Sequence, residues 1–346
     1  MNKKLGINKL MRFLNLVVFA ITIVAYILPF LAPKLFPFLS VLSLLVPFFL
    51  IINVLFFIYW LVQLKKYIAI SGVVLLIGIT FINKFYKFSE LNSPVSKNDF
   101  TIMSYNVRLF NLFEWIPIQD VPIQITNFVK AQNPDILCIQ EFSPVKAINF
   151  KQYPYQYINV EGNTNKYGQA IYSRFKIINR GQIPFPNSSN KVIFVDILKN
   201  NDTIRVYSMH LQSVKISTDI HNNNIDEEKS KFIFKRISEA FKEQQFQAEL
   251  IKKSVANCKL PVIICGDMNN SAYSYVYRSI KGDLKDAFEE AGKGFGTSYN
   301  FKYYPARIDY FLVEKEFEVK QYQSFDSIFF SDHFPLSTRL ELKREK

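Results

Sequence analysis

The chain has 346 residues, a length that fits one large domain or two smaller ones. Its net charge of +13 gathers at the N-terminus: residues 1–96 hold nine basic residues and one acid, and the remainder holds 33 basic and 28 acidic residues. The mild excess of basic over acidic residues in this remainder is compatible with phosphate binding but does not by itself indicate a nucleic-acid partner. Three cysteines without a CxxC pair exclude a thiolate metal site and a disulfide framework, and Cys138 and Cys265 are expected to be buried free thiols.

Three long apolar segments without charged residues come first. They lie between Arg12 and Lys34, between Lys34 and Lys65, and between Lys66 and Lys84. About 20 apolar residues cross a bilayer, so we predict a three-helix membrane anchor over residues 1–83 that contacts lipid through residues 13–83. The first segment is too long for a signal peptide and lacks a cleavage site. Helices without internal charge offer no polar pathway, which excludes a transporter or channel.

The cations beside these segments predict the orientation. Six lie on one side, namely Lys3, Lys4, Lys9, Arg12, Lys65 and Lys66, and three on the other, namely Lys34, Lys84 and Lys87. The positive-inside rule then places the N-terminus in the cytoplasm. Three crossings leave the remainder of an integral membrane protein on the non-cytoplasmic side, which is the periplasm for a bacterial inner membrane.

After a polar linker over residues 84–99, short apolar runs alternate with turns. Strands are predicted at "TIMSYNV", "DILCIQE", "QAIYSRF", "KVIFVDI", "TIRVYSMHL", "PVIICGDMN", "RIDYFLV" and "LSTRLEL". Helical patterns cover about residues 121–130 and 228–255. Such a mixture indicates an α/β fold with two sheets packed face to face and helices outside.

Polar side chains stand at the ends of these strands. They are Asn106, Glu141, His210, Asp267, Asn269, Asp309, Asp332 and His333. Any one of them alone is explained by the preference of Asp and Asn for turns. Turn preference explains the whole set less well, because functional side chains are often placed at the ends of the strands of a rigid sheet. The third histidine, His221, has no evident partner and is interpreted as a loop residue.

The ordered motifs "SYNVR", "CIQE", "YSMHLQS", "CGDMNN", "RIDYF" and "SDHFPL" resemble the endonuclease/exonuclease/phosphatase superfamily. The resemblance covers about residues 100–342 and is specific, since all six motifs occur in order. It implies a four-layer α/β/β/α sandwich, DNase I-like, with a catalytic domain over residues 100–346 behind the three transmembrane helices. It also implies divalent-metal-dependent hydrolysis of a phosphoester at one edge of the sandwich, and we expect that phosphoester to be a phosphodiester.

The same resemblance assigns the metal ligands. It makes Glu141 the principal ligand, with Asn106 and Asp332 near the same ion. Carboxylate and amide oxygens suit hard cations such as Mg²⁺ or Mn²⁺. Attack on a phosphoester builds negative charge on the phosphate oxygens, so that a cation at this place would neutralise it.

The stretch "GDMNN" is interpreted as the nucleophile-handling segment. Asp267 would hold and deprotonate the attacking water, and Asn269 would donate its amide to a phosphate oxygen or orient the nucleophile. Gly266 would let the backbone turn. On an extended chain, residues two apart share a face, so we expect both side chains to point the same way and Asn270 to be a turn residue.

Two histidines complete the expected acid–base chemistry. His333 would pair with Asp309, which fixes its tautomer and favours its charged form. An alternative partner for Asp309 is Arg307, two residues away. His210 would contact the scissile phosphate and protonate the leaving oxygen, unless it is a satisfied core histidine.

The substrate stays open between nucleic acid and a phospholipid or small phosphodiester. Six tyrosines near the site would stack bases, lie at a lipid interface, or simply pack: Tyr273, Tyr275, Tyr277, Tyr299, Tyr303 and Tyr304. A different class of function, a non-catalytic binding or scaffolding module on the same fold, is the alternative.

Overall fold

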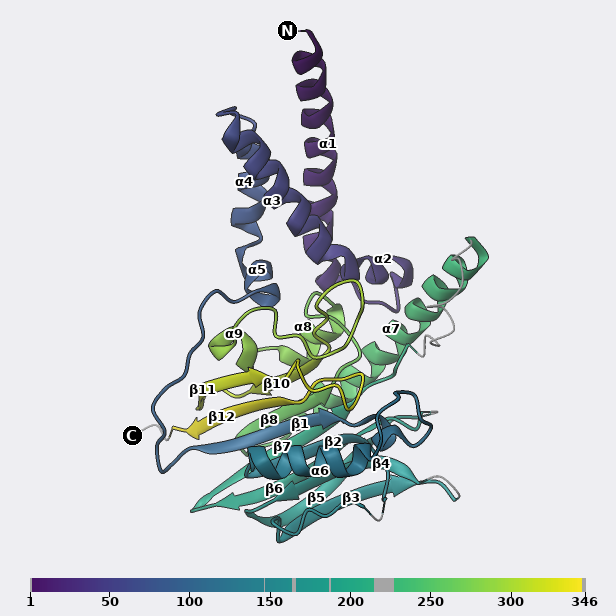
Figure 1. The fold of residues 1–346 in the computed structure, drawn as a ribbon, viewed down its shortest axis with the longest axis vertical. Coiled ribbons are helices and arrows are strands. Elements are labelled where there is room, and N and C mark those ends of the chain that lie inside the picture. Colours follow the sequence, from purple (N-terminus) through teal and green to yellow (C-terminus); the bar gives the residue numbers. More distant parts are fainter. Residues whose placement is uncertain (1, 146, 164–165, 187, 215–226, 344–346) are drawn as a thin grey trace. The chain divides into compact units, whose positions relative to one another are not determined.

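The computed structural model describes residues 2–145, 147–163, 166–186, 188–214 and 227–343 (Figure 1). The chain forms two compact units that are not contiguous in sequence. Unit 1 comprises Met1–Phe85, Val214–Gln245 and Ser271–Arg278, and unit 2 comprises Tyr86–Ser213, Phe246–Asn270 and Ser279–Lys346. His221 lies outside the described residues. The domain limits expected from the sequence stay predictions.

Unit 1 carries the apolar helices. They are α1 (Asn2–Ile27), α2 (Pro37–Val41), α3 (Val46–Val62), α4 (Ile68–Ile77) and α5 (Ile79–Phe85), with 3-10 turns at Leu28–Phe30 and Leu42–Leu45. Two spans, Gly6–Phe30 and Pro37–Val62, are long and apolar enough to cross a membrane. The expectation of three helices is approximately right, because α4 and α5 form a third span only as a pair bent by 70°.

The bend falls at Gly78, which ends α4. The Tyr26 hydroxyl donates to the Val74 carbonyl at 3.0 Å, and a Cβ at residue 78 would collide with that hydroxyl. Glycine is therefore required for this approach, and its weak helix propensity favours the break.

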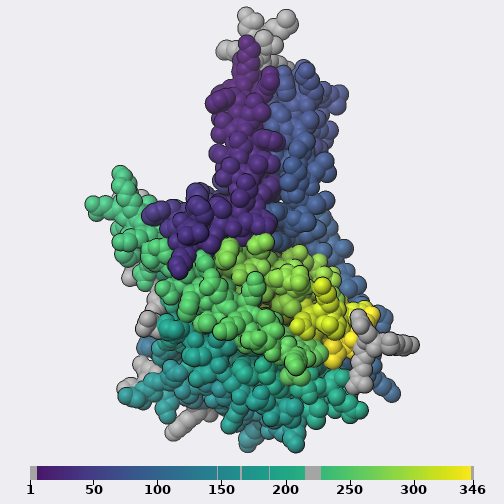
Figure 2. All heavy atoms as spheres, turned by 180° about the vertical axis from the view of Figure 1, so that it is seen from behind, coloured from purple at the N-terminus to yellow at the C-terminus, as the bar shows by residue number. Residues whose placement is uncertain are grey.

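Buried polar side chains connect the helices of unit 1, which pack side by side in Figure 2. Asn15 of α1 donates to Ser71 Oγ of α4 at 2.7 Å and accepts from Trp60 Nε1 of α3 at 2.9 Å. Such interhelical hydrogen bonds stabilise helix association in lipid. The bonds fit a membrane anchor built as one bundle.

Unit 2 consists of two six-stranded sheets. The first has the order β11-β12-β1-β2-β4-β3 and the second β5-β6-β7-β8-β10-β9. The strands of the first sheet are β1 (Phe100–Asn106), β2 (Ile136–Phe142), β3 (Tyr155–Glu161), β4 (Tyr167–Ser173), β11 (Phe317–Ser324) and β12 (Leu336–Leu342). Those of the second are β5 (Lys176–Pro184), β6 (Lys191–Lys199), β7 (Asp202–His210), β8 (Val262–Asp267), β9 (Lys285–Asp286) and β10 (Asp309–Val313).

Alternation of side chains along the strands builds the layers. On β1 and β2, Ile102 and Cys138 face the core between the sheets, whereas Met103 and Ile139 face the outer cluster that contains helix α6 (Val121–Gln132). The second sheet is covered by the C-terminal part of helix α7 (Glu227–Ala256), where Ser254 Oγ lies 3.0 Å from the hydroxyl of a β7 tyrosine. The α/β/β/α sandwich expected from the sequence is confirmed (Figure 1).

All eight predicted strands and both predicted helices are present, and the structure adds four strands. The added strands, β3, β5, β9 and β11, occupy the four edge positions of the two sheets. Edge strands are partly solvated, as the exposed residues of β3 and β5 show, so they lack the apolar runs that reveal central strands. Short helices α8 (Tyr275–Lys281) and α9 (Ala287–Ala291) were also not predicted.

The predicted linker belongs to unit 2 from Tyr86 onward, whereas Lys84 and Phe85 end helix α5 of unit 1. Lys87 and Gly294 exchange backbone hydrogen bonds of 2.8 and 2.9 Å. The Arg339 guanidinium donates to Asp99 Oδ2 at 2.6 Å and to the Pro94 carbonyl at 3.2 Å. These contacts hold the polar segment in place despite its lack of regular structure.

Candidate active site

Neighbouring strand ends bring the polar residues together. In the second sheet, His210 on β7 pairs in register with Asp267 on β8, and Asp267 pairs with Asp309 on β10. In the first sheet, Asn106 on β1 lies beside the end of β2, which carries Glu141. The Asn106 amide donates to Glu141 Oε1 at 3.2 Å and to Asp267 Oδ2 at 3.0 Å, so that it joins the two sheets at the site.

Glu141 is aimed by an irregularity in its strand. The register of β2 against β4 shifts between Ile139 and Phe142, and Glu141 itself has φ +49°. A bulge re-aims a side chain, and a left-handed φ is costly for a residue with a Cβ. This backbone turns the carboxylate of an otherwise buried strand toward the edge that carries Asp267.

Asp267 is fully buried and accepts several hydrogen bonds. The backbone N–H of Asn269 donates to its Oδ1 at 2.7 Å, and Asn269 Nδ2 donates to its Oδ2 at 3.1 Å. Burial is the main reason that the pKa of Asp267 is raised to about 8.

Asn269 contacts Asp267 through a backbone conformation that the sequence did not indicate. The strand ends at Asp267, and Asn269 has φ +52°, so the expected extended chain through both residues is wrong. A left-handed turn, which asparagine tolerates, folds its side chain back. Asn270 is buried, and its carbonyl accepts from the Tyr310 hydroxyl at 3.0 Å.

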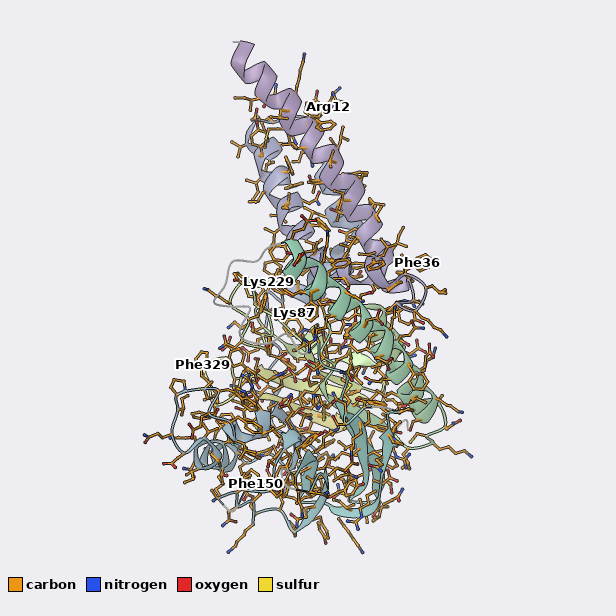
Figure 3. All side chains as sticks on the ribbon, turned by 90° about the vertical axis from the view of Figure 1, so that its right-hand side faces the viewer. Arg12, Phe36, Lys87, Phe150, Lys229 and Phe329 are labelled. Atoms are coloured by element: carbon orange, nitrogen blue, oxygen red, sulfur yellow. The ribbon has the colours of Figure 1, made fainter. Side chains whose placement is uncertain are left out.

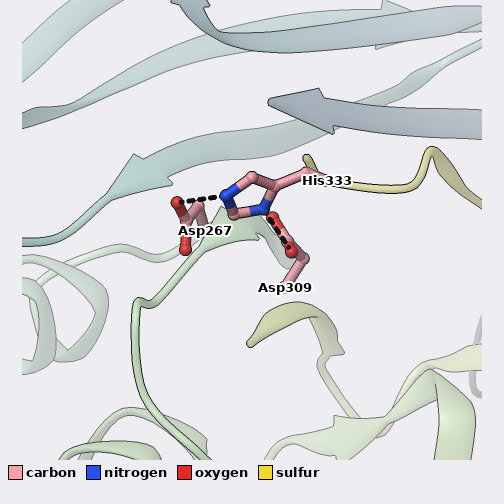
Figure 4. A group of neighbouring side chains, drawn as sticks. All are labelled: Asp267, Asp309 and His333. Atoms are coloured by element: carbon pink, nitrogen blue, oxygen red, sulfur yellow. Dashed lines mark hydrogen bonds and ion pairs between the residues drawn. The ribbon is translucent and has the colours of Figure 1, made fainter. Parts of the chain in front are cut away.

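His333 and Asp309 form a buried pair (Figure 4). Their Nδ1 and Oδ2 atoms lie 2.9 Å apart, and His333 Nε2 lies 3.7 Å from Asp267 Oδ2. Burial alone would lower the pKa of His333, but Asp309 and Asp267 raise it well above its ordinary value. The alternative partner of Asp309 is engaged elsewhere, since Arg307 donates to Asp286 at 2.7 Å.

His210 points its Nε2 at the two carboxylates. This atom lies 3.6 Å from Glu141 Oε1 and 3.7 Å from Asp267 Oδ2. It is buried and finds no hydrogen-bond partner among the described residues. Burial lowers the pKa of His210, so the ring is neutral at neutral pH. An unpaired nitrogen facing two acids leaves hydrogen-bonding capacity for a ligand.

Asp332 lies next to this group and pairs with an arginine. Its Oδ2 is 3.1 Å from Arg108 Nη1, and the neighbouring Ser331 hydroxyl donates to the Asn106 carbonyl at 2.9 Å. The Arg108 guanidinium stacks over the Trp115 ring at 4.6 Å. Sequence reasoning missed Arg108, although it is the last residue of the "SYNVR" motif.

The tyrosines differ in their surroundings. Tyr299 packs edge-on against His333 with ring centroids 4.9 Å apart, and burial raises its pKa to about 12. Tyr303 is exposed. Tyr273 and Tyr277 are buried in unit 1, where the default expectation of packing is met.

The donor set fits a hard divalent cation. Glu141 and Asp332 offer carboxylate oxygens, and the Asn106 amide contacts Glu141 and Asp267. Asp267, Asp309 and His333 are a second possible ligand set, with donor atoms within 4.8 Å of one another. His333 and Asp309 are already hydrogen-bonded to each other, which favours a proton-handling pair over a metal site there.

Comparisons with known proteins agree with this geometry. A family model described as the endonuclease/exonuclease/phosphatase family matches residues 103–333, and a domain of unknown function (DUF8431) matches residues 8–85. A search of curated proteins finds no match.

Solved structures show the same fold at low identity. An endonuclease/exonuclease/phosphatase from Beutenbergia cavernae has a TM-score of 0.54 and 15% identity, over 71% of this chain and 72% of that one. The human Nocturnin catalytic domain with bound sulfate has a TM-score of 0.52 and 18% identity, over 75% and 97%. D. rerio TDP2 complexed with a single-strand DNA product has a TM-score of 0.53 and 15% identity, over 71% and 100%.

Proposed function

Since the chain belongs to the endonuclease/exonuclease/phosphatase family and is a metal-dependent phosphoester hydrolase, we propose that it hydrolyses phosphodiesters with Mg²⁺ at the site around Asp267. The observation that carries the proposal is the buried, unpaired Nε2 of His210, 3.6 and 3.7 Å from Glu141 and Asp267. The two carboxylates accept hydrogen bonds from Asn106, whereas His210 Nε2 has no hydrogen-bond partner among the described residues.

We assign Glu141, Asp332 and Asn106 to holding Mg²⁺, or Mn²⁺ in its place. A bound divalent cation would neutralise charge on the phosphate oxygens. The amide orientation of Asn106 follows from its hydrogen bonds, and turning the amide over presents its oxygen instead. Arg108 holds the Asp332 carboxylate in position beside this set.

Proton transfer is assigned to the buried acids and histidines. Asp267 accepts a proton from the attacking water, and Asn269 holds the Asp267 carboxylate through two hydrogen bonds. When substrate is bound, the Asn269 amide donates to a phosphate oxygen in place of the Leu211 carbonyl. His333, held by Asp309, is the second acid–base group. His210 directs its Nε2 to the scissile phosphate and protonates the leaving oxygen.

The apolar helices of unit 1 supply a membrane anchor in this proposal, with unit 2 on the non-cytoplasmic side. The positive-inside distribution of the nine flanking cations supports that orientation. The anchor keeps the enzyme at a bilayer, in a bacterial inner membrane with the catalytic unit in the periplasm.

The test is hydrolysis of bis-p-nitrophenyl phosphate by the full-length protein in detergent, with Mg²⁺ or with EDTA. EDTA is expected to abolish turnover. Asp267→Asn is expected to lower turnover about 100-fold or more, because the amide cannot accept the proton of water. Asp283→Asn, an exposed acid outside the site, is the matched control and should behave as wild type. EDTA-resistant turnover, or an active Asp267→Asn, would contradict the proposal.

A further inference from the structure

Three loops of unit 2 surround the candidate site. They cover residues 107–120, 299–306 and 325–334. Arg108 of the first pairs with Asp332 of the third, and the Asn300 N–H of the second donates to the Asp332 carbonyl at 2.8 Å. All three loops therefore meet at a residue assigned to the metal site.

These loops expose large apolar side chains. Those that are 37–65% exposed are Leu112, Phe113, Trp115, Phe301, Tyr303 and Phe329, here named the apolar rim. Phe329 lies at the outer edge of unit 2 in Figure 3. Within the loops, Phe113 packs on Trp115 and Phe301 on Tyr303. Exposed apolar groups that pack together mark a binding surface more often than apolar side chains exposed singly.

The first loop holds its part of the apolar rim in a fixed conformation. Residues 108–111 all have left-handed φ angles, from 42° to 61°. The Asn111 side chain donates to the Ile116 carbonyl at 2.9 Å and accepts from its N–H at 3.1 Å. Trp115 packs between the Arg108 guanidinium at 4.6 Å and the Phe113 ring at 5.1 Å. Four costly backbone conformations persist only where the surroundings enforce them.

A narrow surface crevice without room for a water molecule lies between the first and third loops. Its lining residues are Arg108, Asn111, Ile116, Phe330, Ser331 and Asp332. Arg108 and Asp332 of the site therefore lie beside the apolar side chains of Ile116 and Phe330.

The charge of the loops argues against a polyanion. The three loops hold two basic residues, Arg108 and Lys302, and four acids, Glu114, Asp120, Asp326 and Asp332. Arg108 is already paired with Asp332. Nucleic-acid binding needs several cations on successive phosphates, and single strands need a basic groove beside the stacking rings. The three loops therefore supply stacking rings without a row of cations beside them.

We propose that the apolar rim binds the hydrocarbon or interfacial part of an amphipathic phosphodiester, so that the substrate is a membrane phospholipid. The inference rests on the proposed function and names its substrate class. A phospholipid presents one phosphodiester beside an apolar body, which matches one catalytic centre bordered by apolar side chains. Aromatic side chains favour the boundary between water and lipid. The apolar helices of the chain supply a membrane for such a substrate.

The test compares two substrates in one enzyme. Full-length protein in mixed micelles would be given Mg²⁺ with phosphatidylcholine, phosphatidylethanolamine or phosphatidylglycerol, and separately with bis-p-nitrophenyl phosphate or single-stranded DNA. The double variant Phe113→Ser/Phe329→Ser removes two rim side chains. Ile178→Ser is the matched control, because Ile178 is 50% exposed on edge strand β5. We expect the double variant to lower the ratio of phospholipid to bis-p-nitrophenyl phosphate turnover at least about tenfold, and the control to leave that ratio as in wild type.

The outcomes separate the two proposals. Cleavage of bis-p-nitrophenyl phosphate without cleavage of any phospholipid would overturn the lipid assignment and leave the hydrolase intact. Cleavage of DNA in preference to lipid, with a steep loss at high salt, would also overturn it. An unchanged ratio in the double variant would show that the rim does not bind the lipid. Failure to cleave any of the substrates would contradict the proposed function itself.

Discussion

At the scale of single residues, the site depends on backbone conformations that are costly elsewhere. Glu141 and Asn269 both have left-handed φ angles, at +49° and +52°. Each such residue costs roughly 1–3 kcal/mol. These two turns set the directions of the side chains. One directs the Glu141 carboxylate toward the proposed metal position, and the other folds the Asn269 amide back onto Asp267. The residue types and the order of the strands along the chain can be read from the sequence, but these backbone angles cannot.

The pair of His333 and Asp309 is the residue-scale feature with the sharpest expected consequence. His333→Ala should lower turnover of bis-p-nitrophenyl phosphate about 100- to 10,000-fold, because it removes an acid–base group. Asp309→Asn should act in the same direction by a smaller factor, since the amide cannot favour the charged imidazole. Steady-state rates and Mg²⁺ titrations check both variants, and metal affinity should stay near that of wild type.

Turnover within threefold of wild type in His333→Ala would move the acid–base role to another group. A large loss of Mg²⁺ affinity would instead place His333 among the metal ligands, as its membership of the Asp267–Asp309–His333 cluster allows.

The eight residues singled out from the sequence lie together in unit 2, and their chemical roles stay predictions. Because each of these residues lies at or just after the end of a predicted strand, the sequence already indicated that they would lie close together. Arg108 was missed because a basic residue after a strand has no distinctive pattern, and its pairing with Asp332 joins positions 224 apart in the chain. Long-range partners of this kind need the fold.

At the scale of elements, strand β8 requires glycine at its penultimate position. Gly266 has φ +123°, and a Cβ there would collide with the Met209 carbonyl oxygen of β7 and lie 3.0 Å from Gln140 Nε2. Gly266→Ala should therefore lower the free energy of unfolding by about 3 kcal/mol, because neither backbone can move freely.

Thermal unfolding of the full-length protein in detergent measures this effect. The matched control is Gly282→Ala, which also has a left-handed φ, at +43°, but has open space around its Cβ. Its loss should be about 1 kcal/mol, from the backbone alone. Equal melting temperatures for the two variants would show that the collision of the added Cβ with β7 does not contribute to the loss of stability.

Central and edge strands explain how much of the fold was predictable. Central strands such as β2 and β8 are buried on both faces and read as apolar runs, and all eight strands predicted from such runs are present. The four edge strands were missed for the same physical reason, since solvated residues interrupt their pattern. The bend between α4 and α5 was missed because Gly78 alone does not reveal the Tyr26 contact that requires it.

At the scale of the whole molecule, the number of membrane crossings decides on which side unit 2 lies. Three crossings place it outside the cytoplasm, and two place it inside. The bent pair α4–α5 is the span in question. Lys65 and Lys66 lie on the side of the N-terminus with either number of crossings, so these two cations do not decide between them. The prediction of three rests on the long apolar segment without charged residues between Lys66 and Lys84.

Protease treatment of intact spheroplasts tests this topology. We expect unit 2 to be digested from outside while a tag at the N-terminus stays protected until lysis. Protection of unit 2 in intact spheroplasts would contradict three crossings and place the catalytic unit in the cytoplasm.

The most direct measurement of the central claim is the rate of bis-p-nitrophenyl phosphate hydrolysis as free Mg²⁺ is varied, in wild type and in Glu141→Ala. Glu141 is the acid that the bulge of β2 turns toward the site. The account predicts a saturable Mg²⁺ dependence in wild type, and a turnover reduced by about 100-fold or more in a folded variant that needs far more Mg²⁺. Superimposable Mg²⁺ curves for the two proteins would contradict the account.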